Sequence, residues 1–229
     1  MDIAIVGWHD GLAGQIDSWY ESSYDLNVKI FISPDDSPLQ AVSITRANTK
    51  FSTPADGKFK GRQLILDPTW YLHFNELGVD AVVIAISDPV VRLAQIENAK
   101  KHKINLLNAI HPTSIIGGEA TIGLGVILCA GVIVGYKCEI SDGVIINTGA
   151  QIDHHNVIGK GVTIDPGCVF AGNVLIQEFS TIHTGVKIVN RINVGPHAEI
   201  GAGSLVLKDI EPYSVNFGSP SQFIRRKLE

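Results

Sequence analysis

The stretch VIINTGAQIDHHNVIGKGVTI, residues 144–164, has a large apolar side chain at every sixth position: Ile146, Ile152, Ile158 and Ile164. The same spacing continues outward in both directions, from Ile116 to Val206, and gives sixteen such anchors without a break. Neither an α-helix nor an ordinary sheet has a period of six, whereas a parallel β-helix of hexapeptides does, because each hexapeptide forms one short strand and one corner. Three hexapeptides make one triangular coil. We therefore predict a left-handed parallel β-helix of about five coils over residues 112–207, against the usual right-handed crossover.

A second series supports this register. Of the sixteen residues that lie two positions before an anchor, fourteen are Ser, Ala, Val or Cys, and the exceptions are Asn156 and Ile192. A narrow prism filled by the large anchors has room only for small side chains at its other inward positions. A side chain two positions after an anchor, such as that of His154, is then expected to point outward and to be free for chemistry.

The first 110 residues follow a different pattern, in which apolar strands alternate with helices. We expect strands at 2–7, 26–32, 79–86 and 104–107, helices at 12–20, 68–77 and 89–102, and a polar loop or insertion at 33–61. Asp67-Pro68 and Asp88-Pro89 each combine an N-cap residue with proline at the first helical position. The alternation predicts an α/β, Rossmann-like domain with a parallel sheet. The domains are therefore expected at 1–110 and 111–229, the second ending in a short tail.

Composition excludes several classes of protein. The net charge of −5 and the lack of a Lys/Arg-rich run, apart from 225–227, argue against nucleic acid as the main partner. No apolar run approaches the roughly 20 residues that span a bilayer, so no membrane insertion is expected. We see no leader before the first strand. Three cysteines, of which Cys138 and Cys168 fall in the inward series, suggest a reducing compartment, and we expect a cytoplasmic protein.

Several stretches carry a resemblance to a known family. They are 146–148 with 152–159, Ala171-Gly172-Asn173-Val174, and Gly218-Ser219-Pro220. With an α/β domain before the repeat, the chain resembles the bacterial sugar acetyltransferases of the sialic-acid O-acetyltransferase and bacillosamine N-acetyltransferase family. The resemblance implies a homotrimer with acetyl-CoA in the groove between adjacent β-helices. It also implies a nucleotide-linked amino sugar held between the N-terminal domain and a neighbouring subunit.

The leading hypothesis is an acetyl-CoA-dependent N-acetyltransferase that acts on the amino group of a nucleotide-linked 4-amino-deoxy sugar for surface glycans. The same scaffold suits a sugar O-acetyltransferase, and the sequence does not separate the two reactions. A γ-carbonic-anhydrase-like metalloenzyme needs three convergent histidines, and the repeat has histidines at 154, 155, 183 and 197 without the usual spacing. We expect no metal, and we interpret His183 and His197 as incidental. A non-catalytic scaffold that only trimerises is the remaining alternative.

Two adjacent histidines are the candidate catalytic residues. His154 is outward in the register, and a neutral imidazole suits the removal of a proton from an attacking amine. In the matching family motif this histidine is the base. His155 stands where many relatives have an acidic residue that orients the base, and a histidine does not supply that negative charge. The sequence leaves open whether His155 has a role in catalysis.

The resemblance also assigns residues to acetyl-CoA. It implies that the backbone N–H of Gly172 holds the thioester carbonyl, as in an oxyanion hole, next to Asn173. The phosphates of CoA need basic side chains near the C-terminal coils, for which the candidates are Lys187, Arg191, Lys208 and Arg225. Asn147, seven residues before His154 and outward in the register, is a candidate for the acceptor or for a corner cap.

The acceptor candidates lie at strand ends of the first domain. The turn 7–14 contributes Gly7, His9, Asp10 and Gly11, and it lacks the Gly-x-Gly-x-x-Gly spacing of a dinucleotide site. The second strand contributes Ser33 and Asp35, and the third Ser87. The family pattern has a Gly-x-Gly-Gly-His-like turn and paired aspartates directly after the second strand. In this sequence Asp35 and Asp36 lie two residues further along the chain than in the family pattern. The identity of the nucleotide and of the sugar therefore stays open.

Overall fold

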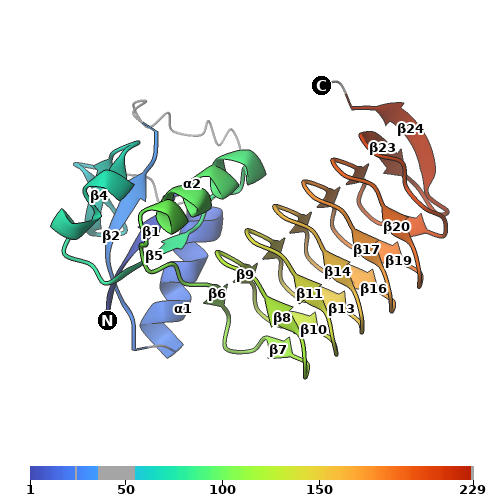
Figure 1. The fold of residues 1–229 in the computed structure, drawn as a ribbon, viewed down its shortest axis with the longest axis horizontal. Helices are drawn as coiled ribbons and strands as arrows, with labels where there is room; N and C mark the ends of the chain where they lie inside the picture. Colours follow the sequence, from blue (N-terminus) through green and yellow to red (C-terminus); the bar gives the residue numbers. More distant parts are fainter. Residues whose placement is uncertain (24, 36–54, 228–229) are drawn as a thin grey trace. The chain divides into compact units, whose positions relative to one another are not determined.

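The computed structural model describes residues 1–23, 25–35 and 55–227, and the chain divides into two compact units, residues 1–107 and 108–229 (Figure 1). Most of the polar segment expected at 33–61 lies outside the described residues. The second unit begins with β6 (Ala109–Ile110), which pairs in parallel with the first coil strand of its sheet.

The first unit is an α/β domain. Its elements are β1 (Asp2–Val6), η1 (Asp10–Gly14), α1 (Gln15–Ser23), β2 (Asn27–Ser33), β3 (Lys58–Phe59), β4 (Arg62–Leu66), η2 (Trp70–Leu72), η3 (Phe74–Glu76), β5 (Ala81–Ile84) and α2 (Pro89–Lys101). The sheet has the strand order β3-β4-β2-β1-β5, in which only the β3–β4 pair is antiparallel. The two adjacent strands β1 and β5 are nearly continuous apolar runs, as is typical of parallel strands buried on both faces. The predicted parallel α/β domain is thus confirmed.

One predicted helix is wrong. Residues 68–77 do not form an α-helix but two short 3-10 turns, η2 and η3. The Asp67 carboxylate accepts hydrogen bonds from the backbone N–H and the hydroxyl of Thr69, at 2.7 and 2.8 Å, instead of capping a full helix. Trp70 is completely buried and donates from Nε1 to Gln95 at 2.8 Å. This tertiary anchor overrides the local helix signal.

The predictions for 88–107 have mixed outcomes. The helix after Asp88-Pro89 is confirmed, since the Asp88 carboxylate accepts from the backbone N–H groups of Val90 and Val91 and caps α2. The expected strand at 104–107 is reduced to one isolated parallel bridge between Val82 and Leu106.

The second unit is a parallel β-helix with three faces. The first face contains β7 (Ile115–Ile116), β10 (Ile133–Val134), β13 (Gln151–Ile152), β16 (Val169–Phe170), β19 (Lys187–Ile188) and β22 (Leu205–Val206). The second face contains β8 (Thr121–Ile122), β11 (Glu139–Ile140), β14 (Val157–Ile158), β17 (Leu175–Ile176) and β20 (Asn193–Val194). The third face contains β6, β9 (Ile127–Leu128), β12 (Ile145–Ile146), β15 (Thr163–Ile164), β18 (Thr181–Ile182), β21 (Glu199–Ile200), β23 (Ser214–Phe217) and β24 (Gln222–Arg226).

From Val126 onward the inward positions are those that the six-residue period predicts, whereas the anchor Ile116 in the first coil is 39% exposed. Ile146, Ile152 and Ile158 are completely buried, and the small residues two positions before the anchors share their core. Equivalent residues of successive coils are 18 apart, as in the pairing of Ile152 with Phe170. Side chains 18 apart therefore form columns along the outside, and the β-helix is a scaffold on which these columns place functional groups.

Candidate active site

The site begins at the turn between the first and second faces, which we call the first corner. His154 lies here, two residues after the end of β13, and its side chain is 48% exposed. The Asp153 carboxylate accepts a hydrogen bond from the His154 backbone N–H at 2.8 Å and fixes the start of the turn. The predicted outward position of His154 is therefore confirmed, and its ring is free to meet a ligand.

Gly172 lies one coil further along the same column as His154, and it supports the imidazole ring. A Cβ atom at Gly172 would come within 2.6 Å of His154 Nε2 and 2.8 Å of Nδ1, so no larger residue fits beneath this ring. Gly172 is buried, yet its backbone N–H donates to no other described residue. A buried amide without a partner is uncommon in folded proteins. This amide is a hydrogen-bond donor available beside the imidazole.

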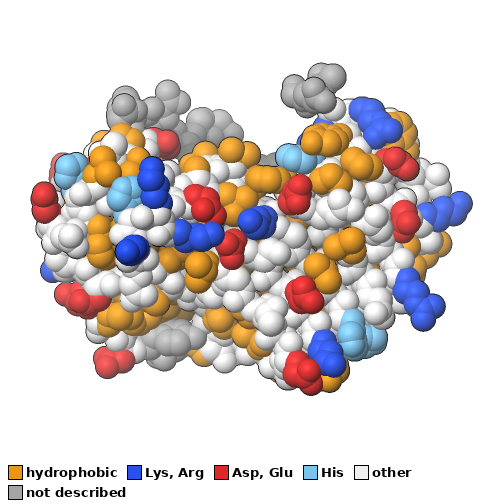
Figure 2. All heavy atoms as spheres, in the orientation of Figure 1, with side chains coloured by type: hydrophobic (Ala, Val, Ile, Leu, Met, Phe, Trp, Pro, Cys, Tyr) orange, Lys and Arg blue, Asp and Glu red, His pale blue; other side chains and the backbone are white. Residues whose placement is uncertain are grey.

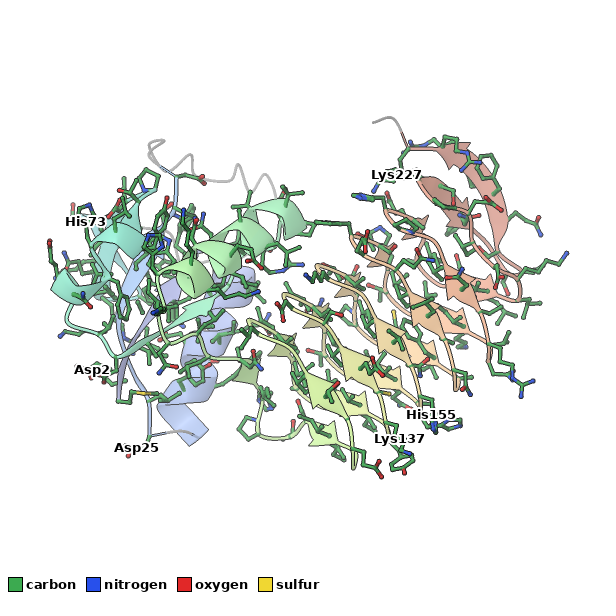
Figure 3. The ribbon with its side chains drawn as sticks, viewed as in Figure 1. Asp2, Asp25, His73, Lys137, His155 and Lys227 are labelled. Atoms are coloured by element: carbon green, nitrogen blue, oxygen red, sulfur yellow. The ribbon has the colours of Figure 1, made fainter. Side chains whose placement is uncertain are left out.

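The two histidines contact each other directly. His154 Nδ1 lies 3.0 Å from His155 Nδ1, a hydrogen bond in which one ring donates and the other accepts. His155 has a left-handed φ of 57°, and its ring packs edge-on against Tyr136. Figure 3 shows His155 beside Lys137 at one edge of the β-helix, and Figure 2 shows histidine and charged side chains at the surface along that edge. His155 is thus placed to orient the imidazole ring of His154.

Asn156 is a site residue whose role the sequence reasoning missed. It is completely buried, and its amide donates to the carbonyls of Asp153 and Ala171, at 2.5 and 3.0 Å. Its carbonyl oxygen accepts from the backbone N–H of Val174 at 2.7 Å. Asn156 therefore joins the turn that carries His154 to the coil that carries Gly172. The signal was present, because Asn156 is a polar exception in the inward series of small residues.

Replacement of Asn156 by Ala should lower both stability and turnover. The change leaves buried carbonyl and N–H groups without partners, which costs about 1–3 kcal/mol of unfolding free energy. Urea unfolding measures this loss, and kcat reports the displaced His154 turn. The matched control is Val174→Ala, one coil further in the same inward column, which removes buried apolar atoms without touching that turn. Equal loss of kcat in both variants would contradict a bracing role for Asn156.

A groove of about 560 Å³ runs along the first face and ends at the first corner. Its lining is mostly apolar, and it is made by Ile133, Gly135, Gln151, Ile152, Asp153, Val169, Phe170, Ala171, Lys187, Ile188, Val189 and Asn190. Asp153 and Ala171 directly precede His154 and Gly172, so the groove leads to these two residues. An apolar channel fits an extended alkyl-amide chain such as the pantetheine arm of CoA.

The basic candidates differ in their relation to this groove. Lys187 lines it, and Lys208 belongs to the column of His154, three coils further along. Arg191 and Asn173 share the next column with His155. Arg225, on β24, lies on the third face and is not brought to the groove within one chain. Of the four candidates, Lys187 lies in the groove itself, and Arg191 directly follows the groove-lining Asn190.

Asn147 lies at a different corner from His154. It follows β12 of the third face, and its amide donates to the Ile164 carbonyl at 3.2 Å and to the Asp165 carboxylate at 3.4 Å. Within one chain, Asn147 thus braces the corner between the third and first faces. The structure does not bring it together with His154 on the same subunit.

His183 belongs to an ionic cluster at that same corner. Its Nδ1 lies 3.0 Å from the Asp165 carboxylate and its Nε2 3.2 Å from the Glu199 carboxylate. Burial on its own lowers the pKa of His183, but hydrogen bonds to and the charges of Asp165 and Glu199 outweigh burial and raise this pKa above its ordinary value. His197 lies elsewhere, stacked between Phe179 and Tyr213. Both histidines are structural in one chain.

The raised pKa of His183 predicts a pH dependence of stability. A raised folded-state pKa stabilises the protein fully below the unfolded value of about 6.5, and this contribution is lost as pH rises through the folded pKa. His183→Gln should therefore cost more unfolding free energy at pH 5.5 than at pH 8.5. Urea unfolding at the two pH values measures the difference. An equal cost at both values would mean that folding does not shift the pKa of His183.

A second pocket, of about 270 Å³, lies within the first unit, and we call it the strand-end pocket. Its lining comes from the carboxyl ends of three neighbouring parallel strands, β1, β2 and β5: Gly7, Trp8, His9, Ser33, Pro34, Asp35, Ala85, Ile86, Ser87, Asp88 and Val91. After β1 the chain builds the sheet to one side and then returns to the other with β5. Ligands of open parallel sheets bind at such a reversal of strand order.

This pocket collects most of the predicted acceptor residues. Gly7, His9, Ser33, Asp35 and Ser87 all line it. Gly7 has a φ of 121°, and a Cβ there would collide with the Ala85 carbonyl, so only glycine fits this close approach of β1 to β5.

Two other acceptor candidates lie in the turn after β1. Gly11 is two residues after His9, which lines the pocket, and the Gly11 N–H donates to His9 Nδ1 at 3.2 Å. Asp10, the first residue of η1, lies between His9 and Gly11 in this turn.

Comparisons with known proteins place this fold among acetyltransferases. No family model matches the chain. A serine acetyltransferase of Bacillus pumilus is 34% identical over 115 residues, 50% of this chain and 46% of that protein. The chain spans less than half the length of the curated relatives it matches.

Solved structures match over nearly the whole chain. PerB of Caulobacter crescentus, solved with CoA and GDP-perosamine, is 23% identical with a TM-score of 0.80, and the match covers 98% of both chains. The acetyltransferase domain of PglB from Neisseria gonorrhoeae, solved with acetyl coenzyme A, is 25% identical over 97% of this chain and 98% of that one, with a TM-score of 0.78. The predicted fold, an α/β domain followed by a left-handed β-helix, is thereby confirmed.

Two features are absent from residues 1–23, 25–35 and 55–227. No helix there is long and apolar enough to cross a membrane. No three His, Cys, Asp or Glu side chains there are grouped so as to hold a metal ion.

Proposed function

We propose that this protein is an acetyl-CoA-dependent N-acetyltransferase that acts on the amino group of a nucleotide-linked amino sugar. The observation that carries the proposal is the pairing of His154 with Gly172: an exposed imidazole lies over a glycine whose buried amide has no partner among the described residues, at the end of an apolar groove. Together they offer a base and an oxyanion donor on either side of one reacting carbonyl.

The transfer runs in one displacement. The amine nitrogen attacks the thioester carbonyl carbon, His154 Nε2 accepts a proton from that nitrogen, and the Gly172 N–H donates to the carbonyl oxygen as it becomes negative. The intermediate then expels the CoA thiolate, which takes the proton from His154. For His154 to accept at Nε2, its own proton sits on Nδ1 and is donated to His155 Nδ1, across the 3.0 Å contact.

Direct attack is favoured over an acyl-enzyme route through cysteine. The cysteines at 129, 138 and 168 are buried, and burial raises the pKa of Cys129 to about 12 and that of Cys168 to about 11. A thiol that stays protonated is a poor nucleophile. Both substrates are therefore expected to be bound together during transfer.

The acceptor class follows from the strand-end pocket and from the related structures. The pocket combines an aromatic side chain, Trp8, with polar groups at the strand ends, which suits a nucleotide. PerB is solved with GDP-perosamine, and PglB with acetyl coenzyme A. We infer a nucleotide-linked 4-amino-deoxy sugar destined for a surface glycan, acetylated in the cytoplasm. Acetyl transfer to a sugar hydroxyl uses the same geometry and is the second candidate.

We also propose a homotrimer, in which a neighbouring β-helix closes the groove. The outward positions of the first face include Ile115, Ile133 and Val169, which are 59%, 38% and 39% exposed in one chain. Apolar side chains gathered on one face mark a contact surface. Asn147, which lies at another corner, would reach an active site only as the residue of an adjacent subunit.

Assembly is tested by sedimentation equilibrium at assay concentrations. The expected mass is three times that of the 229-residue chain. Replacing both Ile133 and Val169 by Glu should shift the protein toward monomer and abolish turnover, because charges are then buried in the contact. A monomeric wild-type protein with full activity would contradict the trimer.

Catalysis is tested by thiol release from acetyl-CoA with UDP-, GDP- and dTDP-linked 4-amino sugars. Mass spectrometry of the product distinguishes amide from ester, and the matching 4-hydroxy sugar nucleotides test for O-acetylation. Release with an amino sugar and none with its hydroxyl counterpart supports the proposal. Failure to bind CoA or acetyl-CoA in calorimetry would falsify it.

A further inference from the structure

A buried arginine stands behind one wall of the strand-end pocket. Arg92, in the second turn of α2, is completely buried and does not line the pocket itself. Its Nη1 donates to the carbonyls of Ile86 and Ser87, each at 2.7 Å. These carbonyls belong to the segment between β5 and α2, and Ile86, Ser87 and Asp88 all line the pocket. One guanidinium therefore holds the main chain of this wall.

The two hydrogen bonds fix the direction of two backbone amides. In a trans peptide unit the N–H points opposite to the C=O. Because the carbonyls of Ile86 and Ser87 point toward Arg92, the N–H groups of Ser87 and Asp88 point away from it. Within the part of the chain that the structure describes, neither N–H donates to another residue. The backbone N–H groups of Ser87 and Asp88 are thus two adjacent hydrogen-bond donors at the pocket wall.

Charge gives Arg92 a second effect on the pocket. The lining contains the carboxylates of Asp35 and Asp88, which disfavour an anionic ligand. Burial lowers the pKa of the Arg92 guanidinium to about 10, and Asp88 partly opposes that fall, so Arg92 stays cationic at neutral pH. Burying a cation is unfavourable unless its surroundings compensate the charge. The positive charge offsets the two carboxylates from behind the wall.

We propose that Arg92 is a positioning residue for a nucleotide in the strand-end pocket. It aims the N–H groups of Ser87 and Asp88 at an acceptor oxygen of the nucleotide, in the phosphates or in a base carbonyl. The substrate class rests on the function proposed above, whereas the role of Arg92 rests on its own contacts. Arg92 touches no reacting atom, so it should affect acceptor binding and not the transfer step.

The test compares Arg92→Met, which removes the charge and the donors, with Arg92→Lys, which keeps both in part. Calorimetry with UDP, GDP and dTDP should show at least about tenfold weaker binding in the Met variant, and an intermediate loss in the Lys variant. The KM for the sugar nucleotide should rise similarly, while the KM for acetyl-CoA and kcat at saturating acceptor stay unchanged. The same titrations with uridine, guanosine and thymidine locate the acceptor: a loss confined to the diphosphates assigns it to phosphate.

Gln95→Met is the matched control for packing. Gln95 lies on α2, is 9% exposed, and accepts the Trp70 hydrogen bond, so its loss destabilises the helix away from the pocket. It should lower the melting temperature without changing nucleotide affinity. If Arg92→Met does not fold, Arg92→Lys tests the proposal instead. The Lys variant must then raise the KM for the sugar nucleotide while its melting temperature stays at or above that of Gln95→Met.

Two results would overturn the inference. The first is unchanged nucleotide affinity in folded Arg92 variants. The proposed function would still stand in that case if the wild-type protein acetylates a sugar nucleotide. The second is a wild-type protein that binds none of the three diphosphates. A third outcome separates the two proposals. If no sugar nucleotide is acetylated but nucleotide binding still depends on Arg92, the proposed function is refuted and the role of Arg92 in nucleotide binding stands.

Discussion

His154→Ala should lower kcat by roughly 10²- to 10⁴-fold, the usual contribution of a positioned general base. The imidazole lies over Gly172, half-exposed at the end of the groove, and is the base nearest to the unpartnered amide. Binding of acetyl-CoA should change little, because the ring meets the acceptor amine and not the pantetheine arm. Steady-state kinetics on the amino-sugar nucleotide and calorimetry with CoA separate the two effects.

His155→Ala is the companion variant. It removes the hydrogen-bond partner of His154 Nδ1 and should cost less than His154→Ala, because His155 orients the base without touching the substrate. Near-normal turnover of His154→Ala together with an inactive His155→Ala would mean that the roles are reversed. If both variants stay active, the amine arrives deprotonated and the site works by positioning alone.

The second large effect is expected for Gly172→Ala. The new Cβ would stand within 2.6 Å of His154 Nε2, so the imidazole must leave its place above the amide. Base and oxyanion donor are then separated, and we expect kcat to fall by about 10²-fold or more, as when an oxyanion donor is lost. The fold should survive, because the collision is with a side chain that can swing into solvent.

Gly118→Ala provides a closely matched control. Gly118 belongs to the same column, three coils before Gly172, and a Cβ there would meet only Tyr136 Cδ2, at 4.0 Å. The substitution is chemically identical and the backbone position is equivalent. It should leave kcat unchanged. A similar loss in both variants would mean that the β-helix, and not the imidazole, is what Gly172→Ala disturbs.

The β-helix could be predicted from sequence because a single rule governs it. A period of six with small residues at the second inward position leaves one architecture, and the register then placed His154 outside. The contact between His154 and His155 could not be predicted. It depends on the left-handed backbone of His155, at φ 57°, which turns two neighbouring side chains toward each other.

In the first domain, prediction failed where tertiary contacts outweigh local signals. Asp67-Pro68 has the same cap pattern as Asp88-Pro89, yet only the second begins an α-helix. The difference is Trp70, whose burial and bond to Gln95 tie the first segment into the core. Strand β4 was not predicted, and it pairs with β2 over four residues. Pairing partners so distant in the chain are invisible to local patterns.

The column of His154 also fixes distances along the axis of the β-helix. His154 and Lys208 are separated by three coils of parallel strands, which sets them about 14 Å apart along the axis. Within the repeat, chain length can change without breaking register only by whole coils of 18 residues, or by loops that bulge from a corner. Each added or lost coil would move Lys208 by about 5 Å relative to the thioester. With Lys208 as the candidate contact of the CoA phosphates, the number of coils would set the length of carrier arm that fits between this contact and His154.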